Sequence, residues 1–244
     1  MTQRIFKAEG LVLRTRPLGE ADRLVTLLTR EEGKFEAVAR GARKVKSKLA
    51  AGVDLFTHGH YNFHRGKTWP IITGQDPIER FLRFREDPDL YPYGLYFAEL
   101  TDRLVSGQSP GVEIFELLLE GWKVLSEAVD RPLICRAFEL KLAHAAGYNP
   151  HLEACTCCGS EKVAVFSPRQ GGMVCTACPC ADGMKIGSGT VALARRLIKT
   201  SLALVKMVRP SISQKQELAK MTASFLIYHL DLGEIKSRRL LADI

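Results

Sequence analysis

Two pairs of cysteines with the spacing Cys-x-x-Cys lie within one short stretch of the chain. Cys155 and Cys158 form the first pair, and Cys175 and Cys178 form the second after a gap of sixteen residues. Each pair offers two thiolates to one metal ion, and a gap of this length allows the second pair to fold back onto the first. A closed site of four sulfurs typically holds one tetrahedral Zn²⁺ and leaves no coordination position open for catalysis. The pattern therefore predicts a structural zinc module with one Zn²⁺ per chain.

Disulfide bonds are the alternative use of these cysteines. Disulfides require an oxidising compartment, and the first residues contain no apolar run typical of a signal peptide. No segment approaches the roughly 18 uninterrupted apolar residues of a membrane span, so we expect a cytoplasmic protein without a membrane contact. The total of seven cysteines is odd. We leave Cys157 and Cys180 out of the ligand set because the two pairs satisfy the spacing without them.

A zinc nucleobase deaminase is a second alternative for the same region. Those enzymes use a His, two Cys and a Glu to activate water, and His151, Glu153, Cys175 and Cys178 imitate that set. However, Val174 stands where the deaminase motif has a proline, and Cys155 and Cys158 would have no role. We therefore favour the closed four-cysteine site.

Charge is distributed unevenly along the chain. Residues 1–80 carry 15 Lys and Arg against 9 Asp and Glu, whereas residues 81–150 carry 7 against 11. Residues 151–187 are balanced, and residues 188–244 carry 10 against 4. Two basic ends around an acidic middle favour a polyanionic partner for the ends, and leave the middle for protein partners.

The pattern of the first eighty residues predicts short strands separated by turns. Apolar residues alternate or cluster in residues 11–15, 24–29, 35–39, 53–56, 61–64 and 69–72. Short strands at this spacing predict a small barrel or sandwich. The oligonucleotide-binding (OB) barrel is the five-stranded member of that set, so we expect residues 1–80 to form an OB-fold domain.

A cationic run lies inside this predicted barrel. Residues 40–48 contain five cations and no acid. These are Arg40, Arg43, Lys44, Lys46 and Lys48. Such a run can simply aid solubility, but clustered cations next to a nucleic-acid barrel favour phosphate binding. Phe35, Phe56, Tyr61, Phe63 and Trp69 could stack on bases, although we expect most of them to be core residues.

From residue 88 onward the apolar period becomes helical. We expect helices over residues 91–104, 114–125 and 133–147, the second of them starting at Ser109 and Pro110. Further helices are expected over residues 190–208 and 214–232. Residues 81–244 would thus form a helical domain, with the zinc module inserted at about residues 150–187.

The predicted helix over residues 190–209 has a cationic face. Arg195, Lys199, Lys206 and Arg209 lie on one side of a helical projection, with apolar residues opposite. We take Arg195, Arg196 and Lys199 as further candidate DNA-binding residues. A basic face that only keeps the helix solvated is the simpler alternative.

Several short segments along the chain are distinctive in combination. They are EGLVL at residues 9–13, GEAD at 19–22, RGARK at 40–44, KSKL at 46–49, GYNP at 147–150, FSP at 166–168, GG at 171–172 and both cysteine pairs. Through these segments the whole chain resembles the bacterial recombination mediator family RecO. The resemblance implies an OB barrel, a helical domain and a zinc-binding insert. It also implies a non-enzymatic role in the RecFOR route. That role comprises binding single- and double-stranded DNA, annealing strands, displacing the single-strand-binding protein, and loading RecA together with RecR.

A zinc-ribbon adaptor of transcription or RNA processing is the competing class. Such an adaptor would share the basic charge and the cysteines, but not the RecO-like segments. Annealing of complementary oligonucleotides without ATP separates the two classes.

Overall fold

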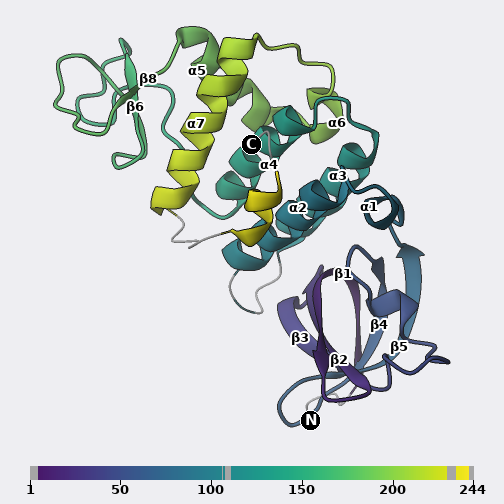
Figure 1. Ribbon diagram of the computed structural model, residues 1–244. Coiled ribbons are helices and arrows are strands. Elements are labelled where there is room, and N and C mark those ends of the chain that lie inside the picture. Colours follow the sequence, from purple (N-terminus) through teal and green to yellow (C-terminus); the bar gives the residue numbers. More distant parts are fainter. Residues whose placement is uncertain (1–4, 106, 108–110, 230–234, 242–244) are drawn as a thin grey trace. The chain divides into compact units, whose positions relative to one another are not determined.

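The alternating apolar residues near the start of the chain form five strands that close into a barrel (Figure 1). The strands are β1 (Ile5–Leu18), β2 (Asp22–Thr29), β3 (Gly33–Ala39), β4 (His58–His64) and β5 (Ile71–Glu79). Their order is β1-β2-β3-β5-β4, and β4 pairs with β1 to close the ring. This is the OB barrel that the sequence predicts. The computed structural model describes residues 5–105, 107, 111–229 and 235–241.

The long first strand holds the barrel together because it pairs with two neighbours. Its first half pairs with β4 and its second half with β2, both antiparallel. Side chains that alternate inward from the strands make the core. The barrel core contains Ala8, Val12, Val25, Leu27, Phe35, Ala37, Ala39, Ala42, Val53, Tyr61, Phe63 and Ile72.

Residues 53–56 do not form the strand that their apolar pattern predicts. Val53 is the last residue of a 3-10 turn, η1 (Ala51–Val53), and Phe56 has a positive φ of 67°. The apolar pattern arises because Val53 and Phe56 are buried outside the strand ladder. Phe56 is fully buried, and its ring centroid lies 5.0 Å from that of Phe84 and 5.6 Å from that of Trp122.

Contacts divide the chain into two compact units, residues 1–126 and 127–244. In the first unit the barrel is followed by α1 (Arg83–Glu86), α2 (Tyr91–Leu104) and α3 (Val112–Glu127). The last two confirm the predicted helices over residues 91–104 and 114–125. The predicted helix start at Ser109 and Pro110 lies outside the described residues. A domain boundary after residue 80 stays a prediction.

In the second unit α4 (Arg131–Ala145) packs against the helices that follow it. These are α5 (Ser188–Lys199), α6 (Leu202–Val205) and α7 (Ile212–His229), and a 3-10 turn, η2 (Lys236–Leu240), comes after them. α7 corresponds to the helix predicted over residues 214–232, of which residues 230–232 lie outside the described part. Within the described residues, no helix is both long enough and apolar enough to cross a membrane.

The helix predicted over residues 190–208 is broken, so that prediction is wrong. Thr200 has extended backbone angles, and α6 starts anew after Ser201. Ser and Thr favour helix ends because their hydroxyls compete for backbone hydrogen bonds. The break turns Leu202 and Val205 into the core, where both are fully buried.

The cysteine module is inserted between α4 and α5 and contains a small antiparallel sheet. Its strands are β6 (Val165–Ser167), β7 (Gly172–Val174) and β8 (Met184–Lys185), in the order β7-β6-β8. The sheet is tied to α7, which lies beside it in Figure 1. The ring of Phe166 lies 6.3 Å from that of Phe225, and His229 Nε2 is 2.6 Å from the carbonyl oxygen of Pro168. The chain therefore combines a barrel with a helical region that carries a four-cysteine insert.

Candidate metal centre and nucleic-acid surface

The four cysteines of the two Cys-x-x-Cys pairs meet at one point. The sulfur atoms of Cys155, Cys158, Cys175 and Cys178 all lie within 4.8 Å of one another. Cys158 Sγ and Cys175 Sγ are 3.6 Å apart. Cys155 and Cys175 are buried, whereas Cys158 is exposed. Four convergent sulfurs are compatible with a closed structural zinc site.

Short turns bring the two pairs together. In the first pair the Gly159 N–H donates to the Cys155 carbonyl at 2.9 Å, and the Cys155 N–H donates to the Ser160 carbonyl at 2.8 Å. Gly159 has a φ of +75°, which a residue with a side chain rarely adopts. Gly171, with a φ of +71°, closes the turn between β6 and β7 that returns the second pair to the first. The glycines therefore account for the local geometry.

The cysteine cluster has unequal thiol acidities. A hydrogen bond from the Cys175 backbone N–H lowers the pKa of the Cys155 thiol to about 6. Hydrogen bonds with the side chains of Cys158 and Cys175 raise the pKa of the Cys178 thiol, because they favour its neutral form. A divalent cation would compensate the charge of the thiolates, since metal-bound thiols are deprotonated. The donor set therefore fits Zn²⁺.

The remaining cysteines lie outside the metal cluster. Cys157 Sγ donates to Gln170 Oε1 at 2.8 Å, and Cys180 Sγ donates to Asp182 Oδ1 at 3.6 Å. Cys135 is fully buried in α4, and burial raises the pKa of its thiol. All seven cysteines lie in the described residues, and none of them forms a disulfide.

The residues of the deaminase alternative do not assemble. The metal-ligating group found among the described residues contains neither His151 nor Glu153. Glu153 instead pairs with Arg195, with 3.2 Å between Oε2 and Nε. The backbone of His151 bonds to Gly171 and Met173, which joins it to the small sheet. The region therefore lacks the water-activating arrangement of that class.

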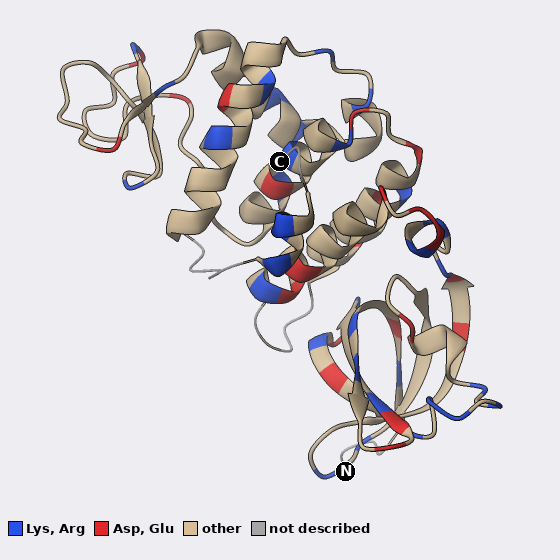
Figure 2. Cartoon of the chain, in the orientation of Figure 1, with Lys and Arg blue, Asp and Glu red and all other residues tan. Residues whose placement is uncertain are grey.

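The cationic run forms a loop with anchored ends, residues 40–50, which we call the basic loop. Figure 2 shows it as a blue stretch that extends away from the strands. At its start the Gly41 N–H donates to Asp22 Oδ1 at 2.7 Å, and the Arg43 N–H donates to the Ala21 carbonyl at 2.9 Å. At its end Gln75 Nε2 donates to the Lys48 carbonyl at 3.0 Å.

The cationic side chains of the basic loop are available to a ligand. Arg40, Arg43, Lys44, Lys46 and Lys48 are all exposed. Arg43 Nη1 donates to the Gly19 carbonyl at 2.8 Å, which holds the guanidinium in place and leaves its other donors free to bind an anion. The loop therefore presents several positive charges on a backbone that the barrel positions in advance.

Most of the barrel's aromatic residues are core, as the sequence predicts. Phe35, Phe56, Tyr61 and Phe63 are buried. Trp69, between β4 and β5, is partly exposed. The buried rings offer no stacking face to a base.

The three candidate DNA-binding residues on α5 have different environments. Arg195 donates to the carbonyl of Leu152 and pairs with Glu153, so it joins α5 to the start of the insert. Arg196 and Lys199 are exposed. Because the predicted helix is broken, Lys206 and Arg209 do not continue the face of α5.

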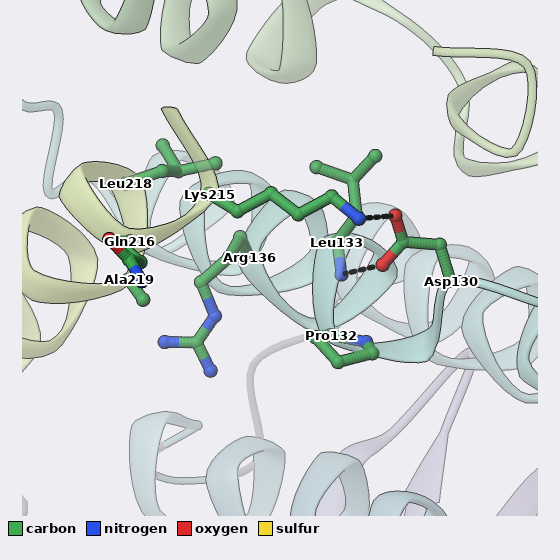
Figure 3. Close-up of a pocket in the computed structure, with 8 residues that line it drawn as sticks. All are labelled: Asp130, Pro132, Leu133, Arg136, Lys215, Gln216, Leu218 and Ala219. Atoms are coloured by element: carbon green, nitrogen blue, oxygen red, sulfur yellow. Dashed lines mark hydrogen bonds and ion pairs between the residues drawn. The ribbon is translucent and has the colours of Figure 1, made fainter. Parts of the chain in front are cut away.

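A pocket of about 240 Å³ between α4 and α7 was not predicted from the sequence (Figure 3). Its lining comprises Asp130, Pro132, Leu133, Arg136, Lys215, Gln216, Leu218 and Ala219. Asp130 Oδ1 accepts from the Leu133 N–H at 3.3 Å and so caps α4, while Asp130 Oδ2 lies 2.5 Å from Lys215 Nζ. The pocket thus has apolar walls and a neutralised ion pair at its rim. Its residues come from segments some eighty positions apart in the sequence, so no local sequence pattern predicts the pocket.

Two family models match the chain. The model described as "Recombination protein O N terminal" matches residues 1–81, and the model described as "Recombination protein O C terminal" matches residues 85–239. Together they cover the barrel, the helices and the cysteine insert.

Curated relatives match over most of the chain, and each is named "DNA repair protein RecO". The protein from Roseiflexus sp. (strain RS-1) is 35% identical over 236 residues, which cover 95% of this chain and 83% of the relative. The protein from Alkaliphilus metalliredigens (strain QYMF) is 32% identical over 232 residues, 93% of this chain and 94% of the relative. The protein from Heliobacterium modesticaldum is 39% identical over 206 residues, 80% of this chain and 74% of the relative.

Proposed function

The chain belongs to the RecO family of DNA repair proteins, and on that premise we propose that it is a non-enzymatic recombination mediator that binds DNA and anneals complementary strands. The observation that carries this proposal is the basic loop, where five exposed cations stand on an anchored backbone at the edge of an OB barrel. Clustered cations bind the phosphates of any sequence and release their counterions.

Annealing follows from charge neutralisation. The basic loop holds the sugar-phosphate backbone of one strand, and the exposed Arg196 and Lys199 of α5 hold phosphates of a second strand. Reduced repulsion between two bound strands lets their bases search for the correct register. No nucleotide hydrolysis is needed, because each step is driven by binding alone.

The zinc module has a structural part in this proposal. Cys155, Cys158, Cys175 and Cys178 would hold one Zn²⁺, which supplies folding energy to a segment with a small core of its own. The bound module would in turn position Leu152 and Glu153 against Arg195 of α5.

The partners are proposed from family membership. In the RecFOR route the protein acts with RecR in the cytoplasm, on single-stranded DNA coated by the single-strand-binding protein, and helps to load RecA. The excess of acidic residues in residues 81–150 supports protein partners there, since negative charge repels phosphate.

An annealing assay tests the proposed function. Two complementary fluorescent oligonucleotides are mixed with the protein without any nucleoside triphosphate, and duplex formation is followed against the rate without protein. We expect the protein to accelerate annealing severalfold at low salt, with a steep decline as salt increases. A zinc-ribbon adaptor would bind nucleic acid without accelerating annealing, so a rate equal to the protein-free rate contradicts the proposal.

A further inference from the structure

The middle of the basic loop carries an apolar side chain that the proposed phosphate contacts do not use. Val45 lies between Lys44 and Lys46, and its relative exposure is 103%. A valine adds nothing to phosphate attraction, and full exposure of its methyl groups to water is unfavourable. Single exposed apolar residues are common on protein surfaces, but this one lies between exposed cations of an anchored loop.

The other apolar residues of the loop are used to fasten it. Ala42 is buried in the barrel core, and Leu49 packs against the same core. The loop is therefore fixed to the barrel on both sides of Val45, which is the only fully exposed apolar residue of the loop.

A tight turn places Val45 at the tip of the loop. The Ser47 N–H donates to the Lys44 carbonyl at 3.0 Å, which makes residues 44–47 a turn with Val45 and Lys46 at its two central positions. The side chains at both central positions are exposed. Exposed cations flank the tip on both sides, at Arg43, Lys44, Lys46 and Lys48.

We propose that Val45 inserts beside an unstacked base of a single strand whose phosphates are held by the flanking cations. This inference rests on the proposed function. Cations on both sides of the tip fix the backbone of the strand across it, and an apolar side chain between them lies opposite the bases. The ligand is single-stranded DNA because a wedge in a duplex must break paired stacks at a cost of a few kcal/mol per step and is usually a longer side chain. Separated bases expose their pairing edges to an incoming complement.

The test uses Val45→Ser, with Val129→Ser as its matched control. Val129 is also fully exposed, at 101%, but belongs to the second unit and is not part of the basic loop. The probe is a single-stranded oligonucleotide that contains 2-aminopurine, whose fluorescence increases when it unstacks. We expect Val45→Ser to weaken binding about fivefold, to leave the salt dependence of binding unchanged, and to abolish the increase in fluorescence. Val45→Leu should retain affinity and fluorescence, and Val129→Ser should match the unmodified protein.

The triple variant Arg43→Glu, Lys44→Glu, Lys46→Glu separates this inference from the proposed function. If the triple variant loses affinity while Val45→Ser keeps both affinity and fluorescence, the insertion of Val45 is contradicted and phosphate binding by the loop stands. If the triple variant also binds normally, the basic loop is not the DNA surface and both proposals fail.

Discussion

At the scale of single residues, two cysteines that are close in the sequence differ in whether they belong to the four-cysteine cluster. Cys178 lies in the group of four convergent sulfurs, and Cys180, two residues further on, instead donates to Asp182. Two thiols in the same short loop thus have different expected roles.

We expect Cys178→Ser to lose the metal and to destabilise the protein. Structural zinc in peptides has an apparent binding free energy of about 10–16 kcal/mol at neutral pH, and three remaining thiols hold the ion less tightly. Metal analysis of the purified protein should find one Zn²⁺ per chain before the change and much less after it, with a lower melting temperature.

Cys180→Ser is the control for that prediction. It should keep both the metal content and the melting temperature, because its sulfur is not one of the four. Protein purified without chelators and found free of zinc would contradict the metal site altogether.

The roles of individual residues could be predicted from the sequence only in part. Spacing was enough to separate Cys155, Cys158, Cys175 and Cys178 from Cys157 and Cys180, because the turns that gather them are local. Arg195 was different. Its bond to the Leu152 carbonyl joins residues 43 positions apart, and no local pattern encodes that distance.

At the scale of elements, a carboxylate of α7 fastens the start of α5. Glu217 Oε2 accepts from Thr190 Oγ1 at 2.6 Å and from the Gly187 N–H at 2.9 Å. These two donors lower the pKa of the Glu217 carboxyl below its ordinary value. The contact connects two helices on either side of the break at Thr200 and Ser201.

We expect Glu217→Gln to reduce stability by about 1 kcal/mol at pH 7. A carboxyl whose pKa is lower in the folded state stabilises the protein above its unfolded pKa of about 4.3 and loses that contribution as the pH falls through the folded value. Urea denaturation should therefore show a difference between variant and parent at pH 7 that shrinks at pH 4.

Glu161→Gln is the control, since Glu161 is exposed and lies outside this contact. It should change stability little at either pH. An equal destabilisation by Glu217→Gln at both pH values would contradict an ionised cap.

Helices and strands could be predicted from the sequence where a repeating apolar pattern packs on one continuous core. The strands of the barrel and helices α2, α3 and α4 are of this kind. The pattern fails at residues 53–56, which are apolar because Phe56 packs against Trp122 from a later helix. It fails again at Thr200 and Ser201, where the helix is interrupted although the apolar pattern continues. The interruption allows Leu202 and Val205 to be buried.

At the scale of the whole molecule, both ends of the chain are basic, and both are candidates for DNA binding. Residues 1–80 and 188–244 each carry an excess of six positive charges. The structure identifies Arg196 and Lys199 as the exposed members of the α5 set, whereas Arg195 is engaged with the insert.

We expect Arg196→Glu together with Lys199→Glu to slow annealing and to weaken DNA binding, because the second strand loses its contacts. Annealing rates at low and moderate salt measure this. Normal rates in a folded double variant would confine DNA binding to the barrel and leave α5 with a solubilising role.

Net charge indicates a polyanion but does not say where it binds. The basic loop was predictable because its five cations lie within nine residues of the sequence. The pocket between α4 and α7 was not, because it exists only once two distant helices pack together.

The salt dependence of single-stranded DNA binding tests the central claim most directly. The claim is that the basic loop of the barrel binds phosphates, and the comparison is between the unmodified protein and Arg43→Glu, Lys44→Glu, Lys46→Glu. A control with the same change in net charge replaces the exposed Lys162, Arg169 and Lys185 of the insert by Glu. Loss of three phosphate contacts should reduce the slope of log K against log salt by about 2, with the control close to the unmodified protein. An unchanged slope in the folded loop variant, or an equal loss in the control, would contradict the account.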